Sequence, residues 1–314
     1  MRPVSRLLTL AVTATLVTTG LVAGPAQGAT AATGAPGALS HFDLARKDCL
    51  GTARNSTSKV WFTVANGVLS DVYYPTIDTT NNETLQFMVT DGSTFTDLQN
   101  RDMTYSVSAL DDSGMSCRVT STAKSGKYTL TTDYFTDPQR NSVVMRTRLK
   151  ADQGNPRYRL YARFDGTING NGGGGAANAG ADDAVIDTST GSPVPVSIDT
   201  KTATTAANRD YATPVYAALR ADRPFLAASS GYAGTASDGL QQLDADRRLA
   251  TTYDSAAQGN VVQTAQLDVN GGRSATLGSY NRRSRNSESS LTFHDEFWRR
   301  SVGGARSTAQ RQRT

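Results

Sequence analysis

Histidine and glutamate, which supply most general acids and bases, are scarce in this chain. Histidine occurs only at positions 41 and 294, and Glu83 is the one glutamate before residue 288. A general base must lie within hydrogen-bond reach of its proton, and neither histidine has cysteine or histidine neighbours at metal-ligand spacing. We therefore expect no histidine-dependent hydrolase, no metal site and no cofactor, and we assign no catalytic residue.

Aspartate is plentiful, but most copies stand beside glycine, serine or asparagine. Such pairs are typical of turns, in which the carboxylate caps backbone N–H groups. A hydrolase built on two aspartates is a third interpretation of the chain, after the two given below. It would require an apolar site that raises the pKa of one carboxyl group.

One apolar run, Leu7–Ala23, is long enough to raise the question of a membrane. Arg2 and Arg6 precede it, and the small residues Ala26-Gln27-Gly28 follow it. The run is short for a membrane span and ends in a cleavage signal rather than a cluster of charges. We interpret residues 1–28 as a secretory signal peptide, which predicts an extracellular protein with no membrane contact after cleavage; the alternative is an uncleaved anchor.

Positive charge is scarce in the body of the chain, although the formal net charge is +4. Eight arginines lie in residues 279–314 and two more in the signal peptide, which leaves the region from 29 to 278 net negative. We therefore expect no nucleic-acid partner. Residues 279–314 are rich in arginine and serine without an apolar period, so we predict an unstructured tail.

Only two cysteines are present, Cys49 and Cys117. In an exported chain, two cysteines can form one disulfide. The other interpretation is two separate thiols, one in a loop and one in a strand, because sequence alone does not place the two within bridging distance. Both interpretations stay open at this point.

The clearest positive signal is a predicted hairpin over Ser58–Asp78. Asn66-Gly67 joins two runs rich in β-branched and aromatic residues, and this dipeptide favours a type I′ turn with positive φ at both positions. A two-residue turn predicts Ala65 opposite Val68, Val64 opposite Leu69, and Trp61 opposite Val72. Pro75 lacks a backbone donor and should end the second strand.

Further strands are predicted from alternation of period two. They cover residues 84–90, 104–110, 115–122, 127–136, 141–150, 157–168, 184–187, 194–200, 214–220, 224–229 and 260–269. Long amphipathic helices are absent before residue 278, and only residues 240–243 suggest a helical turn, capped by Ser237 or Asp238. We predict an all-β fold, a large antiparallel β-sandwich over residues 41–278, after a flexible lead-in at 29–40.

The glycine-rich stretch 169–183 interrupts the strand pattern. Its spacing fits neither a calcium-binding loop nor a phosphate-binding loop, so we interpret it as a surface loop. Trp61 is expected in the core. Tyr73 and Tyr74 are adjacent in a strand and should point to opposite faces, which turns one of them outward.

Several segments resemble the N-terminal domain of prokaryotic glucoamylases and glucodextranases of glycoside hydrolase family 15. In chain order they are Lys47–Ala53, Ser58–Phe62, Asn66-Gly67, Val72–Pro75, Asp78, Leu85–Gly92, Thr136–Pro138, Gly234–Leu243 and Tyr253–Val261. The resemblance implies a large antiparallel β-sandwich followed by a helical barrel, on which two glutamates hydrolyse the glycosidic bond with inversion. Glu288 and Glu296 match no motif of that barrel, and we assign them no role.

The resemblance leads to two interpretations of function. In the first, the chain is the N-terminal module of a secreted α-glucan exo-hydrolase, inactive alone, whose partner is the helical-barrel catalytic domain. A reading-frame change near Gly278 is our hypothesis for the loss of similarity there. In the second, the chain is a free-standing carbohydrate-binding module for α-glucan. Tyr73, Tyr74 and Asp78 are the candidate interdomain or sugar contacts.

Overall fold

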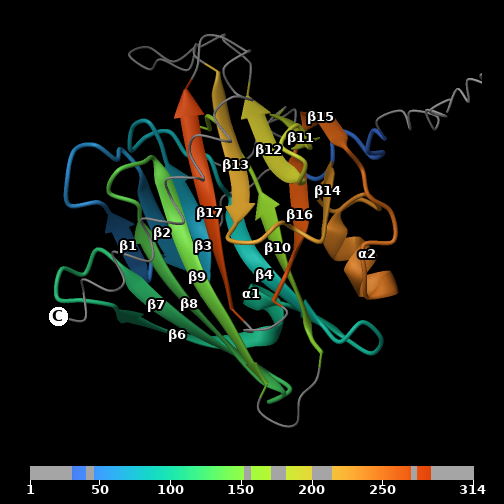
Figure 1. Cartoon of the computed structure of the whole chain (residues 1–314), viewed down its shortest axis with the longest axis horizontal. Helices are drawn as coiled ribbons and strands as arrows, with labels where there is room; N and C mark the ends of the chain where they lie inside the picture. Colours follow the sequence, from blue (N-terminus) through green and yellow to red (C-terminus); the bar gives the residue numbers. More distant parts are fainter. Residues whose placement is uncertain are drawn as a thin grey trace, which may run out of the picture.

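Two antiparallel sheets pack face to face in the computed structural model of the chain (Figure 1), which confirms the predicted all-β sandwich. The structure describes residues 30–39, 46–151, 157–170, 182–199, 214–269 and 274–283. The predicted signal peptide, most of the glycine-rich loop and the chain from residue 284 lie outside these ranges.

Eight strands form the first sheet in the described part of the chain, in the order β1-β2-β3-β4-β10-β16-β14, with β5 paired to β4. Their bounds are β1 Cys49–Thr52, β2 Trp61–Ala65, β3 Val68–Tyr73, β4 Thr84–Thr90, β5 Thr96–Leu98, β10 Arg159–Asp165, β14 Ala227–Tyr232 and β16 Val261–Leu267.

The second sheet has nine strands within the same described ranges, in the order β15-β11-β12-β13-β17-β9-β8-β7-β6. Their bounds are β6 Met103–Ala109, β7 Cys117–Ala123, β8 Tyr128–Thr136, β9 Ser142–Ala151, β11 Asp182–Asp187, β12 Val194–Asp199, β13 Val215–Ala221, β15 Ser255–Gly259 and β17 Ser274–Arg283.

The core fills the space between the two sheets. Along β8, Tyr128, Leu130 and Tyr134 are fully buried in it, and Phe62 and Phe87 enter from the other sheet. This alternation is the one that the period-two pattern predicted for β8 and β9. Trp61 is only half-buried and does not belong to the core cluster, so its predicted core position is wrong.

The predicted hairpin is present, but its register shifts in the middle. Asn66 and Gly67 have φ of 50° and 73°, as a type I′ turn requires, and Val64 pairs with Leu69. Beyond that pair, Thr63 lies opposite Asp71 and Trp61 opposite Tyr73, so the predicted pairing of Trp61 with Val72 is wrong. One extra residue on β3, Ser70, forms a β-bulge, which the alternation of residue types does not reveal.

Two predicted boundaries are also wrong. Residues 30–39 are not a free linker, because Ala31 forms a parallel bridge with Ser255 and the Ala38 N–H donates to the carbonyl of Ala233. At the other end, β17 continues to Arg283, past the predicted limit at residue 278. The strands β1, β5, β15 and β17 were not predicted.

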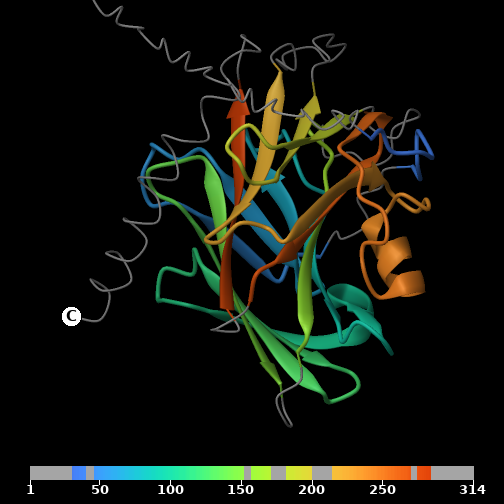
Figure 2. The same ribbon diagram turned by 45° about the vertical axis from the view of Figure 1, so that its right-hand side comes forward.

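Two helices are described, α1 (Gln99–Asp102) and α2 (Gly239–Asp246). Of the two predicted caps of the second helix, Ser237 and Asp238, the cap is Asp238, whose side chain accepts from the Leu240 N–H. Leu243 of α2 packs against Met88 and Tyr161, on the face of β4 and β10 that points away from the main core. In both views of the ribbon, α2 accordingly lies outside the first sheet (Figures 1 and 2).

Candidate functional site

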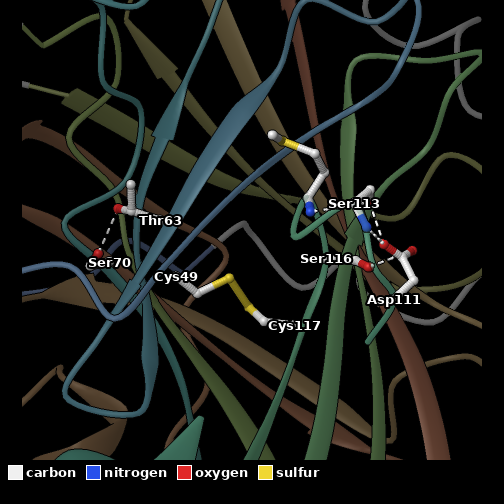
Figure 3. The surroundings of a disulfide bond; sticks show 8 residues. Cys49, Thr63, Ser70, Asp111, Ser113, Ser116 and Cys117 are labelled. Carbon is white, nitrogen blue, oxygen red and sulfur yellow. Dashed lines mark hydrogen bonds between the residues drawn. A yellow bond between two sulfur atoms is a disulfide. The ribbon is translucent and has the colours of Figure 1, made fainter. Parts of the chain in front are cut away.

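A disulfide joins the two sheets at one margin of the sandwich (Figure 3). It links Cys49 on β1 to Cys117 on β7, with their Cα atoms 6.6 Å apart. This confirms the first of the two interpretations of the cysteines. The bond holds a four-residue edge strand onto the opposite sheet, so it fixes the position of β1 relative to the hairpin that follows.

A buried polar cluster lies beside this margin, on β2 and β3. Thr63 Oγ1 is 2.7 Å from Asp71 Oδ2 and 2.8 Å from Ser70 Oγ, and the second contact is drawn in Figure 3. Lys47 Nζ lies 2.5 Å from Asp71 Oδ2. The bulge at Ser70 allows these groups to meet, because it brings Asp71 directly opposite Thr63.

Tyr73 stands at the end of β3 and is half-buried. Burial, together with the neighbouring carboxylate of Asp71, raises the pKa of Tyr73 to about 12. Its hydroxyl is therefore neutral at neutral pH. Tyr74 is only 7% exposed and belongs to the core cluster. One tyrosine of the pair points outward, as predicted, and the ring of Tyr74 is not available to stack on a sugar.

Residues 74–80, which we call the exit loop, are held by their own hydrogen bonds. The Tyr74 N–H donates to the Thr79 carbonyl over 2.9 Å, and the Thr79 N–H donates to the Thr76 carbonyl over 3.1 Å. Asn81 Nδ2 donates to the Tyr74 carbonyl. The loop presents Ile77 at 67% exposure. Ile77 was not predicted as a site residue. The available signal was its position, because it stands between the polar residues Thr76 and Asp78 just after Pro75, which ends the strand.

Asp78, the third candidate residue, lies in the same loop and is half-buried. The structure thus brings the three candidates together at the end of β3, but in three different environments. Tyr73 and Asp78 are accessible in part, and Tyr74 supports the loop from inside the core.

The exit loop lies at the end of the sandwich where β17 finishes. Tyr280 on β17 pairs with Ser142, the first residue of β9. The loop before β9 bonds to the loop before β2, since Asn141 Oδ1 accepts from the Lys59 N–H over 2.9 Å. Trp61, the first residue of β2, pairs with Tyr73. We call this side the exit end.

A second charged group is buried on the outer face of the first sheet. Arg163 of β10 donates to Asp238 from Nε over 3.1 Å and from Nη2 over 2.7 Å, and to Asp165 from Nη1 over 2.8 Å. The Gly234 and Leu240 N–H groups also donate to Asp238. All three charged side chains are at most 10% exposed.

The three charges have different electrostatic roles. Burial alone would raise the pKa of Asp238, but the charge of Arg163 and the hydrogen bonds from Arg163, Gly234 and Leu240 outweigh it and hold the pKa below the ordinary value. Burial raises the pKa of Asp165 in spite of Arg163, and the charge of Asp238 adds to the increase. The ion pairs of Arg163 thus hold Asp238, and with it the turn before α2, against the first sheet. The guanidinium of Arg163 uses Nε, Nη1 and Nη2 to bind the two carboxylates.

Within the described ranges, no three histidine, cysteine, aspartate or glutamate side chains gather so that they could hold a metal ion. In the same ranges, no helix has the length and apolar character needed to cross a membrane.

Comparison with known proteins identifies the family. Residues 32–292 match the family model described as glucodextranase, domain N. The chain belongs to the glucodextranase N-domain family. The matched range covers the segment from residue 32 onward and the whole of β17, which agrees with the corrected boundaries of the fold.

Two relatives extend this assignment of the N domain. A glucoamylase of Clostridium sp. (strain G0005) is 34% identical over 235 residues, which make up 74% of this chain and 30% of that protein. The crystal structure of a bacterial glucoamylase complexed with acarbose superposes with a TM-score of 0.73 at 28% identity, covering 88% of this chain and 37% of the other. The N domain therefore corresponds to a minor part of the relatives that it matches.

Proposed function

We propose that this N domain is the first module of a secreted α-glucan exo-hydrolase of the glucoamylase or glucodextranase type. The module braces a helical-barrel catalytic domain and has no hydrolytic activity of its own. The complete enzyme would release glucose from the ends of starch or dextran with inversion at the anomeric carbon. Similarity to glucoamylases about three times as long as the matched segment, and the scarcity of glutamate here, support the proposal.

The exit loop is the observation that carries the bracing role. It exposes Ile77 on a hydrogen-bonded loop at the exit end, where β17 directs the chain onward. Covering one isoleucine side chain stabilises a contact by up to about 2 kcal/mol. Tyr73 and Asp78 flank Ile77 as polar interdomain contacts in this proposal, and Tyr74 acts only by supporting the loop.

Activity and binding assays on the purified chain test the first part of the proposal. We expect no glucose release from starch or dextran, and no heat of binding with maltooligosaccharides in calorimetry. Glucose release would contradict the proposal. Binding without release would support the free-standing carbohydrate-binding module in its place.

A chimera tests the bracing role. Residues 32–283 would replace the matching segment of the Clostridium glucoamylase, and Ile77→Asp would be introduced into it. We expect a lower Tm and lower glucoamylase activity than in the unmodified chimera. Leu226→Asp is the matched control, because Leu226 is 54% exposed and precedes β14 at the opposite end of the sandwich. Equal effects of the two substitutions would contradict docking at the exit loop.

Secretion is a separate part of the proposal and rests on the apolar run Leu7–Ala23. N-terminal sequencing of protein recovered from the culture medium should give a chain that begins after Gly28. Recovery of the chain only from cells, with Met1 or the apolar run intact, would contradict secretion.

A further inference from the structure

Both sheets are open. Besides the three-residue strand β5, which pairs only with β4, the described part of the sandwich has four edge strands: β1 and β14 in one sheet, β6 and β15 in the other. An edge strand presents a row of unpaired N–H and C=O groups, and native proteins usually cover, shorten or charge such edges. These four edges differ in how far their backbone groups are covered by other parts of the chain.

Three edges are protected. Along β15, Ser255 is bridged by Ala31, and the Ala32 N–H donates to the Ser255 carbonyl over 2.7 Å. Along β14, the Ser230 N–H donates to the Tyr253 carbonyl over 2.9 Å. The strand β1 has only four residues and is fastened by the disulfide of Cys49.

The fourth edge, β6, has no such protection among the described residues. Its sequence, Met-Thr-Tyr-Ser-Val-Ser-Ala, contains no charge and no proline over seven residues. Most of the strand is exposed, including Thr104, Tyr105, Ser106 and Ser108. In Figure 1 it forms the lower margin of the second sheet.

The free backbone groups of β6 follow from its pairing with β7. The Leu110 N–H donates to the Ser116 carbonyl, and the Lys124 N–H donates to the Asp102 carbonyl. In an antiparallel ladder, alternate residues bond to the same neighbour. Even-numbered residues of β6 therefore bond to β7, and the odd-numbered ones (Met103, Tyr105, Val107 and Ala109) direct their N–H and C=O groups to the open side.

We propose that β6 pairs in antiparallel fashion with β6 of a second copy, about a two-fold axis that passes beside Ser106. In this register Tyr105 lies opposite Val107 of the second copy, and Met103 lies opposite Ala109. All four outward-directed residues of each strand then meet outward-directed residues of the other. No other antiparallel register of two identical strands pairs all of them.

The side chains are also self-complementary in this register. Tyr105 and Val107 form two aromatic and β-branched cross-strand pairs, a combination that stabilises sheets. This complementarity favours a second copy over an unrelated strand.

Edge pairing over seven residues is small beside the interfaces of about 1,200 Å² or more that hold stable complexes. The dimer should therefore dissociate on dilution. The proposed dimer does not depend on the proposed function, because it uses the edge strand β6 and not the exit loop.

Sedimentation velocity of the full chain over a concentration series is the first test. We expect a monomer–dimer equilibrium that Ser106→Lys weakens about tenfold or more, because the substitution places two like charges opposite each other at the axis. Ser125→Lys is the matched control, since Ser125 is exposed in the turn between β7 and β8. A chain that stays monomeric, or a dimer that Ser106→Lys leaves unchanged, overturns the proposal.

Cysteine cross-linking tests the register itself. Opposed residues of a pair without hydrogen bonds lie about 4.5 Å apart between Cα atoms, within disulfide range. The Ser106→Cys variant should therefore form a covalent dimer under mild oxidation. Ser108→Cys should not, because its two copies lie about 14 Å apart along the strands. Mixing Thr104→Cys with Ser108→Cys should restore cross-linking. Equal yields from Ser106→Cys and Ser125→Cys overturn the register.

Discussion

The two margins at which the sheets of this sandwich meet are closed by different chemistry. At the disulfide margin, one covalent bond joins β1 to β7. At the opposite margin, which we call the lead-in margin, residues 30–39 lie along β14 and β15 and are held by backbone hydrogen bonds. Ser237 Oγ donates to the Thr33 carbonyl over 2.7 Å, and the next residue, Asp238, is clamped by Arg163.

The difference shows two ways of finishing an open sandwich. The disulfide margin depends on an oxidising environment but needs only two side chains. The lead-in margin is independent of redox state but needs a ten-residue segment, a tight turn and a buried ion group. Four changes test how much each margin contributes to the stability of the fold. They are given in order of decreasing expected effect on that stability.

The largest effect is expected from Asp238→Ala at the lead-in margin. The substitution removes the helix cap of α2 and leaves Arg163 buried with one carboxylate, so we expect a loss of about 3–5 kcal/mol in the free energy of unfolding. Urea titration measures it. Asp244→Ala is the control, because its ion pair with Arg101 is exposed to solvent and should be worth about 1 kcal/mol or less. Similar losses in the two variants would contradict the anchoring role.

Loss of the disulfide comes next. The bond spans 68 residues, and removing it through Cys49→Ser with Cys117→Ser should cost about 2–4 kcal/mol. We expect a reductant to lower the Tm of the natural chain but not that of the double variant. If the natural chain melts at the same temperature with and without reductant, the disulfide margin does not depend on its covalent bond.

A smaller effect is expected from Gly34→Ala in the lead-in. Gly34 has φ of 103°, and a Cβ placed there would lie 2.8 Å from Cβ of Thr235. Gly191 has φ of 80° but no atom within 4 Å of such a Cβ. Both substitutions strain the backbone by about 1 kcal/mol, so the additional loss in Gly34→Ala measures the docking of the lead-in. The readout is Tm, and equal shifts would mean that this contact adds nothing.

The smallest effect concerns Tyr73 near the disulfide margin. An unfolded chain ionises tyrosine near pH 10, whereas burial and Asp71 raise the pKa of Tyr73 to about 12 in the fold. Its contribution is complete below pH 10 and is lost as the pH rises toward 12. Tyr73→Phe should therefore lose less stability than the natural chain over that range, measured by Tm against pH. The change should be slight, because water screens a half-exposed group; identical alkaline profiles would contradict it.

Local signals predicted the part of the fold that local interactions determine. The Asn66-Gly67 turn, the alternating strands β8 and β9, and the Asp238 cap all follow from residues close together in sequence. The bulge at Ser70 does not follow from neighbouring residues, because the side chains that bond to Ser70, Lys47 and Thr63, lie in other segments. A strand with one extra residue has the same composition as a regular one.

The lead-in and the exit loop were missed for a related reason. Residues 30–39 have the alanine, glycine and proline content of a linker, and they are fixed through backbone groups that every residue possesses. Of the three candidate residues, Tyr73 and Asp78 are partly accessible, whereas Tyr74 is buried, and its burial depends on which face of β3 follows the bulge. Ile77 stands out only when its exposure is known.

The lead-in margin has a consequence for the order in which the chain acquires its structure. The Thr30 N–H bonds to the carboxylate of Asp254, 224 positions later. Thr30 is synthesised early, but it can form this hydrogen bond only after Asp254 has been synthesised. Contacts between such distant positions slow folding, so we expect the lead-in to dock late, onto a sandwich that has already formed. Until then, a newly made chain would expose the edge of β15 in addition to that of β6.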